Sequence, residues 1–217
     1  MKMGFSGVRA KRRRAFTALE LVLVIGALTI LVAMYLPSLA RSSRRSSAIS
    51  CTNNQKQIGL GFKIFANDHA DRFPMQVWPD QMPPSALSVQ PSFIFRAMSN
   101  DLSTPLVLVC PKDNRKPASS FSSLSSSNIS YFIGLNAVEN YPQMILAGDR
   151  NLTVGGVQVG PGLLAVTTNT VLGWSATMHE HTGNLTFSDG SVQQTSQMWL
   201  HEYARKQGCA TNWLAIP

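Results

Sequence analysis

The chain has 217 residues, enough for one modest domain plus a targeting segment, and it is 44% hydrophobic and 14% charged. Its formal net charge is +8, but six of its 19 Lys and Arg residues lie within the first fourteen positions. Without residues 1–15 there are 13 basic against 11 acidic side chains, a net charge of +2. This balance excludes a basic nucleic-acid-binding face, so we expect no nucleic-acid partner.

Residues 16–36 form an apolar segment in which Glu20 is the only charged residue. As a helix rising about 1.5 Å per residue, the segment reaches roughly 30 Å, the thickness of the hydrocarbon core of a bilayer. The basic cluster at residues 11–14 should stay cytoplasmic by the positive-inside rule. The sequence therefore predicts a single-pass protein of the cytoplasmic (inner) membrane with an extracytoplasmic, periplasmic domain. The competing interpretations are a plain membrane anchor and a secretory signal cut after Ala40.

Glu20 is explained by neither of these alternatives, because a carboxylate inside an apolar helix costs about 2.5–3.5 kcal/mol on insertion scales and usually has a partner. The run from Arg14 to Ile25, RAFTALELVLVI, resembles the cleavage and methylation signature of type IV prepilins and type II secretion pseudopilins. This resemblance implies that residues 1–15 are a leader, cut by a prepilin peptidase between Ala15 and Phe16, and that Phe16 is N-methylated. It also implies that Glu20 pairs with the terminal amine of a neighbouring subunit during assembly. Ala15 stands where the family usually has glycine.

Residues 37–70 are predicted to continue the same helix. Pro37 matches a proline that is common in the helices of this family, and it should kink or locally melt the helix because it lacks an N–H and clashes with the preceding turn. A stripe of apolar side chains recurs at helical spacing and is predicted to pack against the globular domain; its members are Ile49, Ile58, Phe62 and Phe65.

Residues 71–217 are predicted to form a β-rich globular domain. Apolar or alternating runs indicate strands at residues 106–110, 129–134, 144–147 and 163–166, and a hairpin over residues 185–192 that turns at Asp189-Gly190. Residues 195–207 indicate a closing helix, with Thr195 or Ser196 as N-cap and Gly208 as C-cap. The predicted fold is α+β, with a long N-terminal hydrophobic helix packed on a small antiparallel β-sheet.

A second resemblance covers most of the chain. The segments CTNNQKQIG from Cys51 and VCPKD around Cys110, followed by His179, nine residues and Asp189-Gly190, are similar to a prepilin-type group from Verrucomicrobia and Planctomycetes with a C-terminal His-x9-Asp-Gly motif. This resemblance implies a pseudopilin-like fold. It also implies a structural subunit of a type IV pilus-like or type II secretion pseudopilus filament, with other pilin subunits and an inner-membrane assembly platform as partners. A membrane-anchored extracytoplasmic binding protein that does not polymerise is the alternative.

The cysteines suit an oxidising compartment. Cys51 and Cys110 occupy matching motif positions, and we predict a disulfide between them that leaves Cys209 unpaired. The alternative is three buried thiols that behave as small apolar residues.

The candidates for a metal or catalytic site are His179, Glu180, His181 and Asp189. If this segment is extended, His179 and His181 share one face of a strand. Asp189 also has a structural explanation in its turn, and it is a possible Ca²⁺ ligand. The sequence shows no nucleophile–base motif, phosphate loop or paired-cysteine zinc spacing, so we expect neither an enzyme nor a required cofactor.

Overall fold

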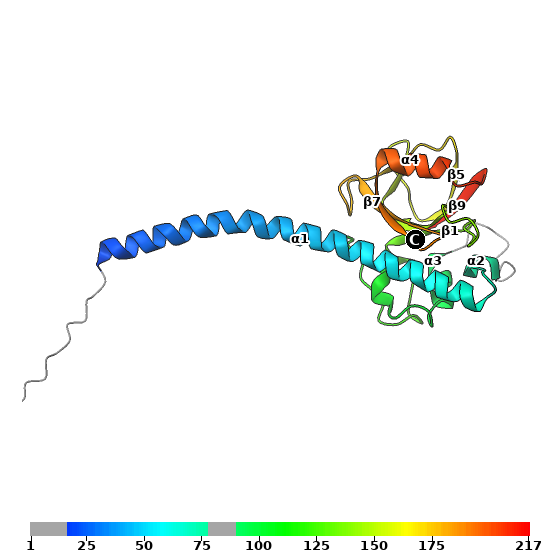
Figure 1. Cartoon of the computed structure of the whole chain (residues 1–217), viewed down its shortest axis with the longest axis horizontal. Helices are drawn as coiled ribbons and strands as arrows, with labels where there is room; N and C mark the ends of the chain where they lie inside the picture. Colours follow the sequence, from blue (N-terminus) through cyan, green and yellow to red (C-terminus); the bar gives the residue numbers. More distant parts are fainter. Residues whose placement is uncertain (1–16, 78–89) are drawn as a thin grey trace, which may run out of the picture. The chain divides into compact units, whose positions relative to one another are not determined.

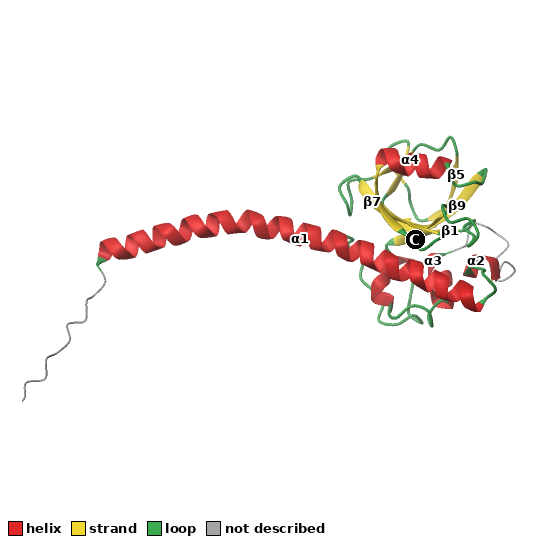
Figure 2. Cartoon of the chain, viewed as in Figure 1, coloured by secondary structure: helices red, strands yellow, loops and turns green. Residues whose placement is uncertain are grey.

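The computed structural model describes residues 17–77 and 90–217, with the backbone alone for residues 37–44. The chain divides into two compact units, Met1–Arg44 and Arg45–Pro217. The predicted leader and its cleavage site at Ala15 and Phe16 lie outside the described residues. Figure 1 shows the chain coloured along its sequence, and Figure 2 shows its helices and strands.

The helix α1 spans Ala18–Asp68 and belongs to both units. It continues through Pro37 without interruption, so local melting at this residue, one of the two predicted effects, does not occur. Proline removes only one backbone donor, and the neighbouring turns keep theirs. The second unit therefore begins within the helix, at Arg45.

The second unit is built on a six-stranded antiparallel sheet, in the order β5-β9-β1-β2-β7-β8. Its strands are β1 (Tyr131–Gly134), β2 (Ile145–Asp149), β5 (Gly162–Thr167), β7 (Thr182–Phe187), β8 (Val192–Ser196) and β9 (Thr211–Ile216). A smaller sheet of order β4-β3-β6 is formed by β3 (Leu152–Val154), β4 (Val157–Gln158) and β6 (Leu172–Trp174). The predicted α+β fold is confirmed.

Alternating side chains of the large sheet divide the interior into two cores. Tyr131 and Ile133 of β1 join a core with α1, whereas Phe132 between them joins a second core with Trp174. This alternation follows from the pleat, which points successive side chains to opposite faces. In Figure 1, residues 45–68 of α1 lie along one face of the sheet, and α4 (Gln197–Arg205) lies on the other side.

Two details of the predicted helix stripe and strands are wrong. Ile49 is 54% exposed, and the buried positions preceding Ile58 are Cys51 and Gln55. Residues 106–110 do not form a strand, because Pro105 begins the 3₁₀ helix η2 (Pro105–Leu108), in which Thr104 Oγ1 accepts from the Leu106 amide. Proline with a capping hydroxyl before it favours a helical turn over an extended run.

The remaining elements are short. The helices are α2 (Pro74–Val77), α3 (Pro91–Ala97) and the 3₁₀ helix η3 (Ser126–Asn128). The predicted closing helix is α4, with Ser196 as N-cap, but its C-cap is Lys206. Gly208 instead has a φ of +72° in the turn that leads to β9. The hairpin at Asp189-Gly190 is confirmed as β7 and β8.

Candidate functional site

The first candidate feature is the apolar start of α1. Ala18–Leu36 is 19 residues long, with a mean hydropathy of 2.4 and no part of it buried, and it is long and apolar enough to cross a membrane. Its large side chains are all more than 40% exposed, including Leu19 at 72% and Tyr35 at 69%. Among the described residues, this is the one helix that meets the length and hydropathy of a membrane span.

Glu20 takes part in the N-terminal cap of α1. Its Oε2 accepts hydrogen bonds from the Thr17 amide, at 2.9 Å, and from Thr17 Oγ1, at 3.0 Å. In return, the Glu20 amide donates to Thr17 Oγ1 at 3.3 Å. This is a reciprocal capping box, whose sequence signature is Thr or Ser followed three residues later by Glu. The spacing was present in the sequence and gives Glu20 a local role besides the predicted pairing between subunits.

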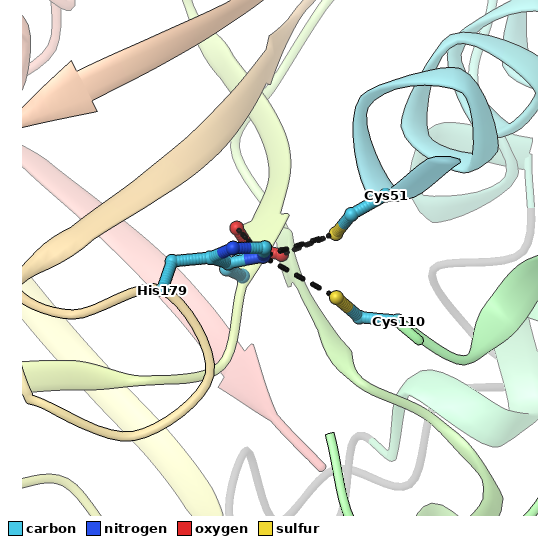
Figure 3. Close-up of side chains that lie close together, drawn as sticks. Cys51, Cys110 and His179 are labelled. Atoms are coloured by element: carbon cyan, nitrogen blue, oxygen red, sulfur yellow. Dashed lines mark hydrogen bonds and ion pairs between the residues drawn. The ribbon is translucent and has the colours of Figure 1, made fainter. Parts of the chain in front are cut away.

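The second candidate feature is a buried cluster of Cys51, Cys110, Asp149 and His179. One ligand atom from each of the four side chains lies within 4.8 Å of all the others, and among the described residues this is the group that could hold a metal ion. Cys51 comes from α1, Cys110 follows η2, Asp149 ends β2, and His179 lies in the loop before β7. Figure 3 shows both sulfur atoms pointing toward the imidazole of His179.

The contacts of this cluster converge on one ring nitrogen. His179 Nε2 lies 3.3 Å from the sulfur of Cys51, 3.3 Å from the sulfur of Cys110 and 3.5 Å from Asp149 Oδ2. The Cys51 sulfur is also 3.4 Å from Asp149 Oδ1. The two cysteines and Asp149 are fully buried, and the side chain of His179 is 3% exposed.

Neighbouring polar groups hold the ligand atoms in place. Gln55 Nε2 donates to Asp149 Oδ1 at 3.0 Å, and the amide and Nδ2 of Asn184 donate to Asp149 Oδ2 at 2.7 and 2.9 Å. The sulfur of Cys51 lies 3.4 Å from Tyr131 Oη and 3.7 Å from Asn184 Nδ2. The sulfur of Cys110 accepts from the Lys112 amide at 3.4 Å.

Hydrogen bonds and burial shift the pKa values of the two thiols in opposite directions. A hydrogen bond from Cys51, together with one from His179, lowers the pKa of Cys110 to about 6, although burial opposes the shift. The same bond to Cys110, together with burial, raises the pKa of Cys51. Burial lowers the pKa of His179, but the hydrogen bond to Cys110 and the charge of Asp149 outweigh it, so that pKa is raised. Burial raises the pKa of Asp149.

The candidate group His179, Glu180, His181 and Asp189 is not brought together around a common point. The segment is not extended, because Glu180 and His181 have φ values of 52° and 64°, and His181 Nδ1 contacts the Trp174 carbonyl oxygen. Asp189 is exposed, and its Oδ1 accepts from the Ser191 amide within the hairpin turn. Of this group, only His179 belongs to the buried cluster.

Asp149 and the convergence of the four residues were missed by sequence reasoning. A lone Asp at the end of a strand carries no ligand signature, and the four positions are 30 to 59 residues apart from one to the next. The predicted disulfide between Cys51 and Cys110 is not formed in the structure, where both are free thiols. The two sulfur atoms do lie within 4.8 Å of each other.

Comparison with known proteins gives no match: no family model fits the chain, and no curated protein or solved structure is similar to it. The function is therefore argued from the chain's own residues.

Proposed function

We propose that this protein is a membrane-anchored filament subunit that assembles through the apolar start of α1, as in type IV pili or secretion pseudopili. The observation that carries the proposal is the extent of unpaired apolar surface on Ala18–Leu36, none of which is buried. Both cores of the second unit are formed by residues from Cys51 onward, so Ala18–Leu36 contributes to neither core. Such a surface requires lipid or other apolar helices around it.

Glu20 is the feature that favours assembly over simple anchoring. An anchor gains nothing from a carboxylate in its apolar segment, and the capping bonds to Thr17 can be made by an uncharged side chain as well. A negative charge becomes useful when a positive one is brought beside it in lipid. The amine of a neighbouring mature subunit, exposed by a prepilin peptidase at Phe16, supplies such a charge.

The test uses two substitutions that separate the charge of Glu20 from its capping role. Glu20→Gln keeps an oxygen acceptor for Thr17 and removes the charge, whereas Glu20→Ala removes both. We expect both variants to remain in the membrane and to lose filament incorporation by more than about tenfold. Without the carboxylate of Glu20, the amine of the neighbouring subunit is left buried and unpaired, which costs more than about 1.4 kcal/mol, the equivalent of a tenfold change. The measurement is the amount of each variant in sheared filament fractions relative to membranes, with Thr29→Ala as the control within the same segment.

Two results would contradict the proposal. If the Glu20→Gln variant enters filaments as well as the wild-type protein does, and only Glu20→Ala fails to enter them, then Glu20 serves in capping alone. The second result combines two observations: mass spectrometry of protein from native membranes finds an N-terminus other than methylated Phe16, and no filaments are formed. Together they would favour the membrane-anchored binding protein that does not polymerise.

A further inference from the structure

We propose that Cys51, Cys110, Asp149 and His179 together bind one divalent transition-metal ion, with Zn²⁺ as the ion that best suits their chemistry. The ion would join α1 to the strand β2, to the segment after η2 and to the loop before β7. This proposal does not rest on the proposed function, because it concerns the second unit alone.

The convergence on His179 Nε2 is the strongest argument. An imidazole nitrogen carries either one proton or one lone pair, so it makes one good hydrogen bond. Here three groups lie 3.3 to 3.5 Å from this nitrogen, namely two sulfur atoms and a carboxylate oxygen. A metal ion among them satisfies all four ligand atoms at once, whereas hydrogen bonding satisfies only one contact of the nitrogen.

The spacings also match tetrahedral coordination. Zinc lies about 2.0–2.3 Å from nitrogen, oxygen and sulfur ligands, so neighbouring ligands of a regular tetrahedron are about 3.3–3.8 Å apart. The three contacts of His179 Nε2, at 3.3, 3.3 and 3.5 Å, lie within this range. The distance of 3.4 Å between the Cys51 sulfur and the other carboxylate oxygen of Asp149, Oδ1, lies within it as well. Two thiolates, an imidazole and a carboxylate form a donor set that favours zinc over calcium or magnesium.

The surroundings have the hydrogen bonds that metal ligands need. The Lys112 amide and Tyr131 Oη lie 3.4 Å from the sulfur atoms of Cys110 and Cys51, respectively. Asp149 accepts from Gln55 and twice from Asn184, which fixes the direction of its carboxylate. Such outer hydrogen bonds orient ligands and stabilise the charge of bound thiolates. Metal binding releases the protons of the two thiols and requires neutral Nε2.

The geometry argues against a catalytic interpretation of the same residues. In a nucleophile–histidine–carboxylate triad, the nucleophile and the carboxylate contact opposite nitrogens of the ring. Here Cys110 and Asp149 both face Nε2, and the cysteine is fully buried. The disulfide predicted from the sequence is the real competitor, because it would consume both thiols and leave His179 and Asp149 facing each other.

The experiment uses the full-length chain without a polyhistidine tag, purified in detergent with neither reductant nor chelator. We expect elemental analysis to find about one zinc ion per chain. After chelation, adding Co²⁺ should produce the d–d absorption of a tetrahedral site together with thiolate-to-cobalt charge-transfer bands. Cys110→Ser and His179→Gln should each lose these bands, while Cys209→Ser, which removes a thiol outside the cluster, should retain them.

Two outcomes overturn the proposal. One is metal-free protein whose intact mass lies two hydrogen atoms below that of the reduced chain, with Cys51 and Cys110 linked in peptide maps. The other is chain with free thiols that gives no tetrahedral Co²⁺ spectrum. If the variants fail to fold, the charge-transfer intensity of the wild-type protein still decides whether two sulfur atoms bind the metal.

Discussion

Replacing Gln55 by alanine tests whether the buried hydrogen bonds between α1 and the large sheet stabilise the packing of the helix on the sheet. Gln55 is fully buried and makes three hydrogen bonds, donating to Asp149 Oδ1 and the Asn184 carbonyl and accepting from Thr186 Oγ1. A bond to a charged group contributes about 1.5–3 kcal/mol and a neutral one about 0.5–1.5 kcal/mol. The Gln55→Ala substitution should therefore lower the free energy of unfolding by about 2.5–6 kcal/mol.

The assay is guanidinium unfolding of the full chain in detergent, followed by tryptophan fluorescence and compared at equal metal content. Trp174 is 1% exposed and reports on the core of the second unit. Lys56→Ala, at the exposed neighbouring position, should change the unfolding free energy by less than about 0.5 kcal/mol. A loss below about 1 kcal/mol for Gln55→Ala, or strict additivity with Thr186→Val, would refute the reasoning.

Two further predictions concern stability. Burial raises the pKa of Asp113, but its hydrogen bonds with Arg150 and Ser130 outweigh this effect and lower that pKa. The ion pair between Arg150 and Asp113, with bonds of 2.7 and 2.8 Å, therefore stabilises the fold above the unfolded pKa and is lost as pH falls through the folded one. Asp113→Asn should cost about 1.5–3 kcal/mol at neutral pH, and its difference from wild type in urea titrations should shrink below about pH 4; a constant difference would contradict this. In Gly134→Ala, the new Cβ would meet the Ile145 carbonyl oxygen at 2.1 Å, so thermal unfolding should show a loss of about 3 kcal/mol or more. The control is Gly160→Ala, which has open space around it; similar losses for the two variants would argue against the close approach.

The parts of the fold that follow from local signals were predictable. The hairpin at Asp189-Gly190 and the helical spacing of Ile58, Phe62 and Phe65 each depend on a few neighbouring residues. The error at Ile49 came from the spacing itself. Nine residues, or about two and a half turns at 3.6 residues per turn, separate Ile49 from Ile58, so the two lie on opposite sides of the helix and Ile49 is exposed.

The strand β9 and the small sheet were not predicted. The segment Thr211–Ile216 carries Asn212, a residue type that is depleted in strands and weakens the strand signal. Its register depends on pairing with β1 and β5. Strands β3, β4 and β6 have only two or three residues each. At such lengths, tertiary packing decides the conformation more than propensity does.

The candidate site was predictable only in its separate members. Cys51, Cys110 and His179 were each singled out by motif, but nothing in the sequence predicted that the cysteines and the histidine lie next to one another in space. The contact among these side chains depends on how α1 packs against the sheet and on the position of Asp149 at the end of β2. The capping box of Thr17 and Glu20 was readable from its spacing and was overlooked because the charge of Glu20 had another explanation.

The position of β9 in the large sheet constrains the order in which the second unit can form. β5 has β9 as its only neighbour in this sheet, and β9 also supplies the second partner of β1. During synthesis β5 is therefore made before β9, the strand with which it pairs, and until then it has no hydrogen-bonded neighbour in that sheet. Until residues 211–216 are available, β1 presents an open edge to other chains, which favours aggregation. The six-stranded sheet is therefore complete only after residues 211–216 have been made, although four of its other strands precede them by many residues.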